Sequence, residues 1–312
     1  MISKRRFLLV AASVTLVLAI PIGGAAAADL DDVLTEARDS TYTASRLIVS
    51  VWGGQTQVTR EFVEHADGME MVRREADWSL AGNGKSASMG EEPGGFTFLT
   101  QQHDAPTGRY TIMERAKVDH MSRPCRIVDV LEGEVLRASF VVDDRSGALL
   151  IQEMFSENGD LFRRTTLSDF RAYRTYEAPM DETEVPMEVV MHEDSELLPE
   201  DAAGYELIDV FSAPGGAEQG YFSDGLFRFS LFVLSGRTVV TGFEDAMVFL
   251  SEDGVYDMVA SAQTVRLRWQ DGSNNYVLVG DVPPDHLREI LAELPAPDSH
   301  GMWGRWWKKL FG

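Results

Sequence analysis

Adjacent acidic residues are the first candidates for chemistry in this chain. Asp143 and Asp144 stand side by side, and paired carboxylates serve general acid–base catalysis. They directly precede Arg145-Ser146-Gly147, and Asp close before Gly between two apolar runs is typical of a hairpin turn. We therefore interpret Asp143 and Asp144 as turn residues.

Histidine and cysteine offer metal binding or nucleophilic catalysis. His192 stands beside Glu193 and Asp194, but the spacing matches no zinc site, so a solvated acidic segment is favoured. Cys125 has only His120 nearby as a base, which favours a buried, inert thiol. The sequence also lacks phosphate-binding, nucleophilic-serine and zinc-protease motifs. We therefore expect a binding or sensing protein rather than an enzyme, with no cofactor and no metal.

The strongly negative net charge of the chain limits the kinds of partner that it can bind. The 312 residues include 28 Lys and Arg against 50 Asp and Glu, for a net charge of −22. Such an acidic body repels phosphate backbones, which excludes nucleic acid as an expected partner. Hydrophobic residues make up 44% of the chain, which is enough for two packed cores.

The N-terminus predicts export. Lys4-Arg5-Arg6 precede an uncharged apolar run over residues 7–22, and Ala26-Ala27-Ala28 follow. This order is typical of a signal peptide cut before Asp29, although the run could also stay attached as an anchor. A single cysteine leaves an exported chain without an internal disulfide, so its cores must be stable through packing alone.

The elements expected downstream are mostly strands. Amphipathic periodicity predicts one helix over residues 30–38 and another over 285–294, the second entered through Pro283-Pro284. Alternating apolar and polar residues separated by Gly-bearing turns predict antiparallel strands. The expected strands are 46–52, 57–65, 69–75, 96–100, 110–113, 125–130, 135–142, 148–155, 161–167, 226–234, 239–240, 246–250, 257–260, 264–269 and 275–279. Residues 82–95 are rich in Gly and Ser and predict a loop, and residues 220–225 predict a turn-rich entry to the second half.

Changes in composition divide the chain into five parts. Residues 1–28 are the signal peptide and 29–176 a β-rich domain. Residues 177–201 are acidic and contain prolines, which predicts a linker. Residues 202–296 then form a smaller α+β domain, and 297–312 form a basic tail rich in tryptophan.

The tail differs from the rest of the chain. Helical spacing puts its large apolar residues on one side and its basic residues mostly on the other. The apolar set is Trp303, Trp306, Trp307, Leu310 and Phe311, and the basic set is Arg305, Lys308 and Lys309. Contact with a membrane or partner, for which we name Trp303, Trp306, Trp307, Lys308 and Lys309, and docking onto the protein's own core are both open.

Two segments resemble the RseB/MucB family of sigma-factor regulatory proteins, whose N-terminal domain is similar to LolA-type lipoprotein carriers. The first is Met121-Ser122-Arg123-Pro124-Cys125-Arg126-Ile127-Val128, with the meander that follows to Asp169-Phe170. The second is Tyr221-Phe222-Ser223-Asp224-Gly225-Leu226 with Ser230-Leu231-Phe232-Val233, and Val279-Gly280-Asp281-Val282-Pro283-Pro284 before the last helix. The basic tail departs from the family pattern.

The resemblance implies an α+β protein, with a LolA-like antiparallel half-barrel packed on helices followed by a smaller α+β domain. It implies a periplasmic or extracytoplasmic protein, near the outer face of the cytoplasmic membrane, that binds the exported part of a membrane-anchored anti-sigma factor. The family shields that partner from regulated proteolysis and responds to lipid or envelope-stress signals. A lipid or lipoprotein carrier is the alternative.

Two surfaces are candidates for these functions. For the partner we expect an exposed edge that carries Tyr221, Phe222, Asp224, Phe227 and Arg228. For a lipid ligand we expect an apolar face made of Leu47, Val49, Val51, Phe140, Val142, Leu149 and Ile151, although the same alternation is also typical of an ordinary core. The sequence does not fix the oligomeric state.

Overall fold

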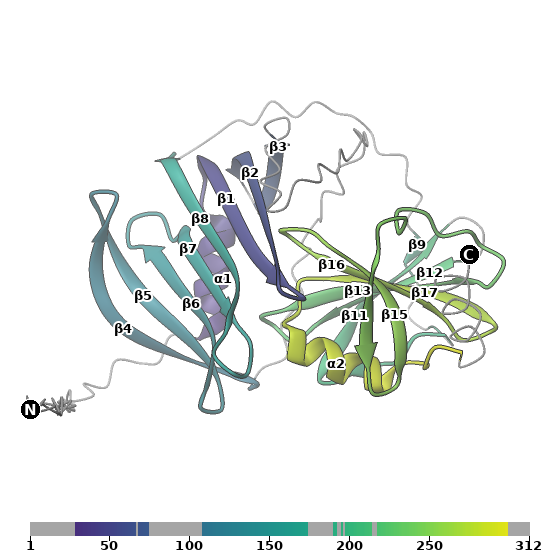
Figure 1. Cartoon of the computed structure of the whole chain (residues 1–312). Helices are drawn as coiled ribbons and strands as arrows, with labels where there is room; N and C mark the ends of the chain where they lie inside the picture. The colour runs from purple at the N-terminus through teal and green to yellow at the C-terminus, as the bar shows by residue number, and fades with distance from the viewer. Residues whose placement is uncertain are drawn as a thin grey trace, which may run out of the picture.

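Two antiparallel sheets, each with one short helix beside it, make up the fold (Figure 1). The computed structural model describes residues 29–66, 68–74, 108–173, 190–191, 195, 197–213 and 217–298. The expected signal peptide, the loop over 82–95, the strand over 96–100, His192 and the tail beyond Asp298 lie outside the described residues.

The first sheet has eight strands in the order β3-β2-β1-β8-β7-β6-β5-β4. They are β1 (Tyr42–Trp52), β2 (Gln55–Ala66), β3 (Met69–Arg74), β4 (Tyr110–His120), β5 (Arg123–Glu132), β6 (Val135–Asp143), β7 (Leu149–Phe155) and β8 (Leu161–Ala172). The meander from β5 to β8 follows the expected antiparallel pairing, and β1 closes onto β8.

The second sheet has nine strands, in the order β10-β11-β12-β13-β17-β16-β15-β14 with β9 paired to β11. They are β9 (Val190–Met191), β10 (Asp201–Ala202), β11 (Tyr205–Ala213), β12 (Ala217–Ser223), β13 (Arg228–Ser235), β14 (Met247–Ser251), β15 (Gly254–Ala260), β16 (Val265–Gln270) and β17 (Asn274–Gly280). β14 is an edge strand of this sheet.

Helix α1 (Leu30–Asp39) covers part of one face of the first sheet. Its start is fixed by the Asp32 carboxylate, which accepts a hydrogen bond from the backbone of Asp29 at 3.3 Å. Leu30 and Val33 pack in one core with Val128 and Phe140. The helix therefore covers a sheet face that the seven-residue lipid site would need free.

Helix α2 (Pro284–Glu293) packs its apolar side against the second sheet. Its side chains Leu287, Ile290 and Leu291 are fully buried in a core shared with Phe229 and Leu278. This core is continuous with the one under α1, because Phe162 of the first sheet and Phe227 of the second have ring centroids 6.2 Å apart. The two sheets therefore share packed apolar contact.

The fold differs from the sequence expectation in its balance of elements. The described chain is mostly β, with two helices of ten residues each, so the α+β interpretation holds only in part. Residues 220–225 were expected as a turn, but β12 runs to Ser223 because Phe222 is fully buried against Phe229 in the core. Residues 239–240 are not a strand and instead belong to the connection before β14.

The linker expectation over 177–201 is wrong in its C-terminal part. β9 and the first residue of β10 lie inside that range and pair with the second sheet. Leu198 is buried in the core at 6% exposure. Burial of this leucine gives the segment a place in the fold that its acidic composition concealed.

Candidate functional site: the junction between the two sheets

A buried polar network crosses from the first sheet to the second. The Tyr110 hydroxyl donates to Asp224 Oδ2 at 2.6 Å, and the Asp224 carboxylate also accepts from the backbone N–H groups of Leu226 and Phe227. Asp224 is fully buried. Burial raises the pKa of this carboxyl, while the hydrogen bonds it accepts oppose that rise.

His286 of α2 sits at the centre of the network, with 1% of its surface exposed. Its Nδ1 lies 2.7 Å from the Tyr205 hydroxyl and its Nε2 lies 3.2 Å from Glu132 of the first sheet. These partners are satisfied when Nε2 carries the hydrogen and donates to Glu132, while Nδ1 accepts from Tyr205. Hydrogen bonding by His286 lowers the pKa of Glu132 to about 2.

Two arginines of the first sheet complete the network. Arg109 donates to Glu132 at 2.8 Å and to the carbonyl oxygen of Ala203 in the second sheet at 3.0 Å. Arg137 donates to Glu132 at 2.7 Å and to Asp285 at 2.6 Å, and both Arg137 and Asp285 are buried. Each arginine thus donates to Glu132 of the first sheet and to a group of the second half of the fold, the Ala203 carbonyl or the Asp285 carboxylate of α2. The planar guanidinium has several N–H donors, which suits such a bridging position.

A second set of polar contacts joins the sheets nearby. Arg163 of β8 donates to Asp281 at 3.0 Å and to the carbonyl oxygen of Gln263 at 3.1 Å. The Gln263 amide donates back to Glu61 of β2 at 3.0 Å, and Ser50 donates to the carbonyl oxygen of Ser261 at 3.1 Å. The junction is therefore held at more than one place.

The junction has the chemistry of a joint rather than of a reaction centre. Its carboxylates and its histidine are bonded to side chains or backbone of the same network, and its acids are neutralised by Arg109 and Arg137. Breaking one member of such a buried network costs more free energy than an exposed ion pair would, because a charge is left unpaired. The network therefore favours one relative orientation of the two sheets.

The expected partner residues do not form an exposed edge. Phe222, Asp224 and Phe227 are fully buried, so the expectation of an accessible site is wrong for these three. Their burial has a physical cause, since Phe222 stacks on Phe229 and Asp224 and Phe227 belong to the junction. Tyr221 is half-buried and Arg228 is exposed, so these two stay accessible.

The expected lipid residues do not share one face. β6 and β7 pair Val141 with Ile151 and Phe140 with Gln152, so Phe140 and Ile151 point to opposite faces of the sheet. Phe140 and Val142 lie in the core under α1, and Leu149 packs against that core. Leu47 and Ile151 both stand opposite Thr166, which puts them in one row on the other face.

The remaining expected lipid residues, Val49 and Val51, alternate with Ser50 and Trp52 along β1. Trp52 is buried in the core, whereas Val49 is half-buried and Val51 is 40% exposed. Val49 and Val51 therefore extend the row that begins at Leu47. A seven-residue apolar surface is not formed.

The other candidates for chemistry have structural roles. Asp143 is buried, accepts hydrogen bonds from Arg123 at 2.9 and 2.7 Å, and closes the hairpin turn through its backbone, which confirms the turn interpretation. Cys125 is fully buried, and burial raises the pKa of its thiol. Within the described ranges, no group of three or more His, Cys, Asp or Glu residues could hold a metal ion.

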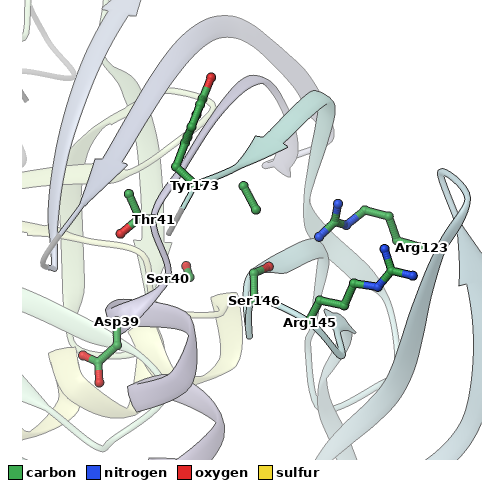
Figure 2. A pocket seen from close by; sticks show the side chains of 8 residues that line it. Asp39, Ser40, Thr41, Arg123, Arg145, Ser146 and Tyr173 are labelled. Carbon is green, nitrogen blue, oxygen red and sulfur yellow. The ribbon is translucent and has the colours of Figure 1, made fainter. Parts of the chain in front are cut away.

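A polar pocket of about 320 Å³ lies at one end of the first sheet (Figure 2). Its walls come from the connection between α1 and β1, the start of β5, the turn between β6 and β7, and the end of β8. The lining residues are Asp39, Ser40, Thr41, Arg123, Arg145, Ser146, Ala172 and Tyr173. Arg123, one of the lining residues, is already paired with Asp143. None of the eight lining residues belongs to the junction.

Sequence reasoning missed most of the junction. Arg109, the hairpin pair Glu132 and Arg137, and His286 come from three separated places in the chain, and no recognised motif links them. One signal was available, since Asp285 and His286 follow Pro283-Pro284 at the start of a helix, where polar residues can meet a neighbouring element. In a separate observation, no helix of the described part of the chain is long and apolar enough to cross a membrane.

Comparison with known proteins gives similarities only among solved structures. No family model and no curated protein matches the sequence. The chain is similar to the MucA/MucB complex of Pseudomonas aeruginosa at 18% identity and a TM-score of 0.49, over 87% of this chain and 100% of that chain. It is similar to MucB at 18% identity and a TM-score of 0.44, over 84% and 96% of the two chains.

A LolA-superfamily protein from Nitrosomonas europaea is a more distant structural neighbour. Its identity is 9% and its TM-score 0.20, over 83% of this chain and 97% of that chain.

Proposed function

We propose that this chain is an exported regulatory protein that binds the extracytoplasmic domain of a membrane-anchored anti-sigma factor. One observation carries the proposal. The two motifs of the second half that resemble the RseB/MucB family each supply one carboxylate to the junction. Asp224 of the first motif accepts from Tyr110, and Asp281 of the second accepts from Arg163.

The two motifs also lie beside each other, although about fifty residues separate them in sequence. The backbone N–H of Asp281 donates to the Arg228 carbonyl oxygen at 3.1 Å, and the backbone N–H of Arg228 donates to the Asp281 carboxylate at 3.2 Å. Phe229 of β13 stands opposite Gly280 of β17. The residues that carry the resemblance thus serve to fasten the second sheet to the first.

A fixed junction suits a protein that binds a partner with both sheets. Because the sheets are already oriented, a partner that touches both loses less freedom on binding than it would with two independent domains. Tyr221 and Arg228 remain accessible beside the junction, and we propose them as part of the partner surface. Shielding the partner from proteolysis and release by an envelope-stress signal complete the proposed role.

The carrier alternative has less support. A carrier needs a free apolar face, whereas α1 packs on Phe140 and Val142. Of the seven predicted lipid-binding residues, Leu47, Val49, Val51 and Ile151 are the four that lie in one row on the face opposite α1. A lipid signal that acts through this strip is compatible with a regulator. A ligand that binds the free protein more tightly than the complex with the anti-sigma factor weakens that complex by the same factor.

Co-purification tests the proposal. The exported chain is mixed with the tagged extracytoplasmic domain of an anti-sigma factor encoded in the same genome, and the bound fraction is measured. Arg228→Glu is expected to reduce it by at least about tenfold, the equivalent of about 1.4 kcal/mol. Arg145→Glu, which changes an exposed arginine of the first sheet, is the matched control. Absence of binding at about micromolar concentrations with both proteins folded would contradict the proposal.

A further inference from the structure

The outer face of edge strand β14 carries an unusual exposed apolar patch. The three most exposed large apolar side chains of the described residues are Val239 at 84%, Leu250 at 69% and Val248 at 50%. Val248 and Leu250 belong to β14, and Val239 lies in the connection just before it. We call Val248 and Leu250 the β14 patch. Isolated apolar side chains at a surface are normal, but an apolar edge strand usually needs a cover.

The β14 patch points away from the core. Phe249, between its two members, faces Tyr256 with ring centroids 6.3 Å apart, and Tyr256 is buried. Val248 and Leu250 therefore lie on the opposite face of the strand. On the sheet path β14 pairs only with β15 among the described strands, so one side of its backbone is also unpaired there.

The described chain ends close to this strand. Pro297 packs against Gly254, the residue that pairs with Ser251 at the end of β14. The backbone N–H of Asp298 is fixed by the Gln270 carbonyl oxygen at 2.8 Å. The last fourteen residues of the sequence, 299–312, therefore begin beside Gln270 of β16, at the same end of the sheet as the end of β14 and two strands from it.

The remaining length is sufficient to reach the patch. Fourteen residues span up to about 46 Å when extended, whereas the five residues of β14 cover about 17 Å. Crossing the two strand spacings from β16 to β14 and then rounding the sheet edge needs about 20 Å, or about six extended residues. Trp306, Trp307, Leu310 and Phe311 come eight or more residues after Asp298, so the chain length lets them reach the outer face of the strand.

The chemistry of the two surfaces is complementary. The tail has three tryptophans and the cations Arg305, Lys308 and Lys309, with no acidic residue. Acidic residues bracket β14, with Glu244 and Asp245 before the strand and Glu252 and Asp253 after it. Apolar contact would be flanked by opposite charge at both ends of the strand.

We propose that residues 299–312 dock on the β14 patch of the same molecule. The tryptophans cover Val248 and Leu250, and the cations lie beside the carboxylates at the ends of the strand. This contact covers an apolar edge strand that would otherwise be free to pair with another chain. It is independent of the proposed anti-sigma factor binding and, of the two uses of the tail left open by the sequence, it selects docking within the molecule over membrane contact.

Thiol labelling tests the docking. Cys125 is replaced by serine to remove the native thiol, and Leu250→Cys supplies a probe in the β14 patch. Its labelling rate is compared in two chains that both begin at Asp29. One runs to Gly312, and the other ends after Asp298 and keeps every described contact. We expect labelling at least about tenfold slower in the longer chain, as for a tail docked about 90% of the time. Met113→Cys, at 49% exposure in β4 of the first sheet, is the control and should label equally in both.

Three results would overturn the proposal. The first is an equal labelling rate in the two chains. The second is protection that grows with protein concentration, which would assign the patch to a second copy. The third is protection that appears only with anionic phospholipid vesicles, which would assign the tail to a membrane surface. A second measurement supports docking separately, since Glu252→Lys with Asp253→Lys should speed labelling of the longer chain while leaving the shorter one unchanged.

Discussion

The Tyr110 hydroxyl of the first sheet donates a hydrogen bond to the buried Asp224 carboxylate of the second sheet, with an oxygen–oxygen distance of 2.6 Å. Tyr110 begins β4, and Asp224 lies in the turn between β12 and β13. The two residues are 114 positions apart. Their contact ties the relative orientation of the sheets to the state of one carboxyl group.

Removing this hydroxyl should destabilise the protein. Tyr110→Phe leaves the ring in place but takes one donor from a fully buried carboxylate, which costs about 1–3 kcal/mol. The free energy of unfolding in urea measures the effect. Tyr173→Phe is the control, because Tyr173 is 40% exposed and its hydroxyl meets Thr43 at 3.4 Å in an exposed contact, so its effect should stay within about 0.5 kcal/mol. Equal effects of the two substitutions would show that the junction bond adds nothing.

The Glu132 carboxyl should make stability depend on pH. Its pKa is lowered from 4.5 to about 2 in the folded protein, first by the hydrogen bond from His286. A lowered pKa contributes stability that is present above the unfolded value and is lost as the pH falls from about 4.5 towards 2. Urea unfolding of the wild type and Glu132→Gln should therefore differ most above about pH 5, and the difference should shrink through that window.

The control for this pH dependence is Glu134→Gln, which changes an exposed glutamate in the adjacent turn. Its unfolding free energy should follow that of the wild type at every pH. A difference between wild type and Glu132→Gln that stays constant from pH 6 to 2 would contradict the assigned role of Glu132.

The position of α1 should depend on Gly147. This glycine has φ +75°, and a Cβ added there would lie 2.7 Å from the Glu36 carbonyl oxygen of α1. Gly159 has φ +77° and nothing within 4 Å of an added Cβ. Gly159→Ala should cost about 1–2 kcal/mol through backbone conformation alone, and Gly147→Ala about 1–3 kcal/mol more through the clash. Calorimetric or urea midpoints of the two variants measure this difference, and similar midpoints would place α1 elsewhere.

Much of the strand arrangement is predictable from local sequence. The alternation in β16 and in β17 fixes which side chains are buried, and Gly-bearing turns set where each hairpin reverses. Helix α1 is predictable because its apolar positions repeat at helical spacing. Each of these signals lies within about a dozen residues, which is the range over which periodicity acts.

The junction was beyond such reasoning because its partners are distant in sequence. Phe227 looks like a member of an accessible edge, since nothing local shows that Phe162 of the first sheet covers it. Phe222 looks accessible for the same reason, although Phe229 of the neighbouring strand β13 stacks on it. The predicted lipid-binding surface is not formed, for a related reason. Side chains change face at each residue along β6 and along β7, but only the register between the strands reveals that Phe140 and Ile151 face opposite ways.

Direct titration of the partner tests the central claim most sharply. The purified extracytoplasmic domain of the anti-sigma factor is titrated into this protein in a calorimeter, with Tyr110→Phe and Arg228→Glu titrated in parallel. We predict saturable binding with a Kd of about 1 μM or tighter, weakened by Arg228→Glu. Tyr110→Phe should also weaken it, since a loosened junction costs preorganisation. Absence of a saturable heat with both proteins folded, confirmed by a second technique, would contradict the account.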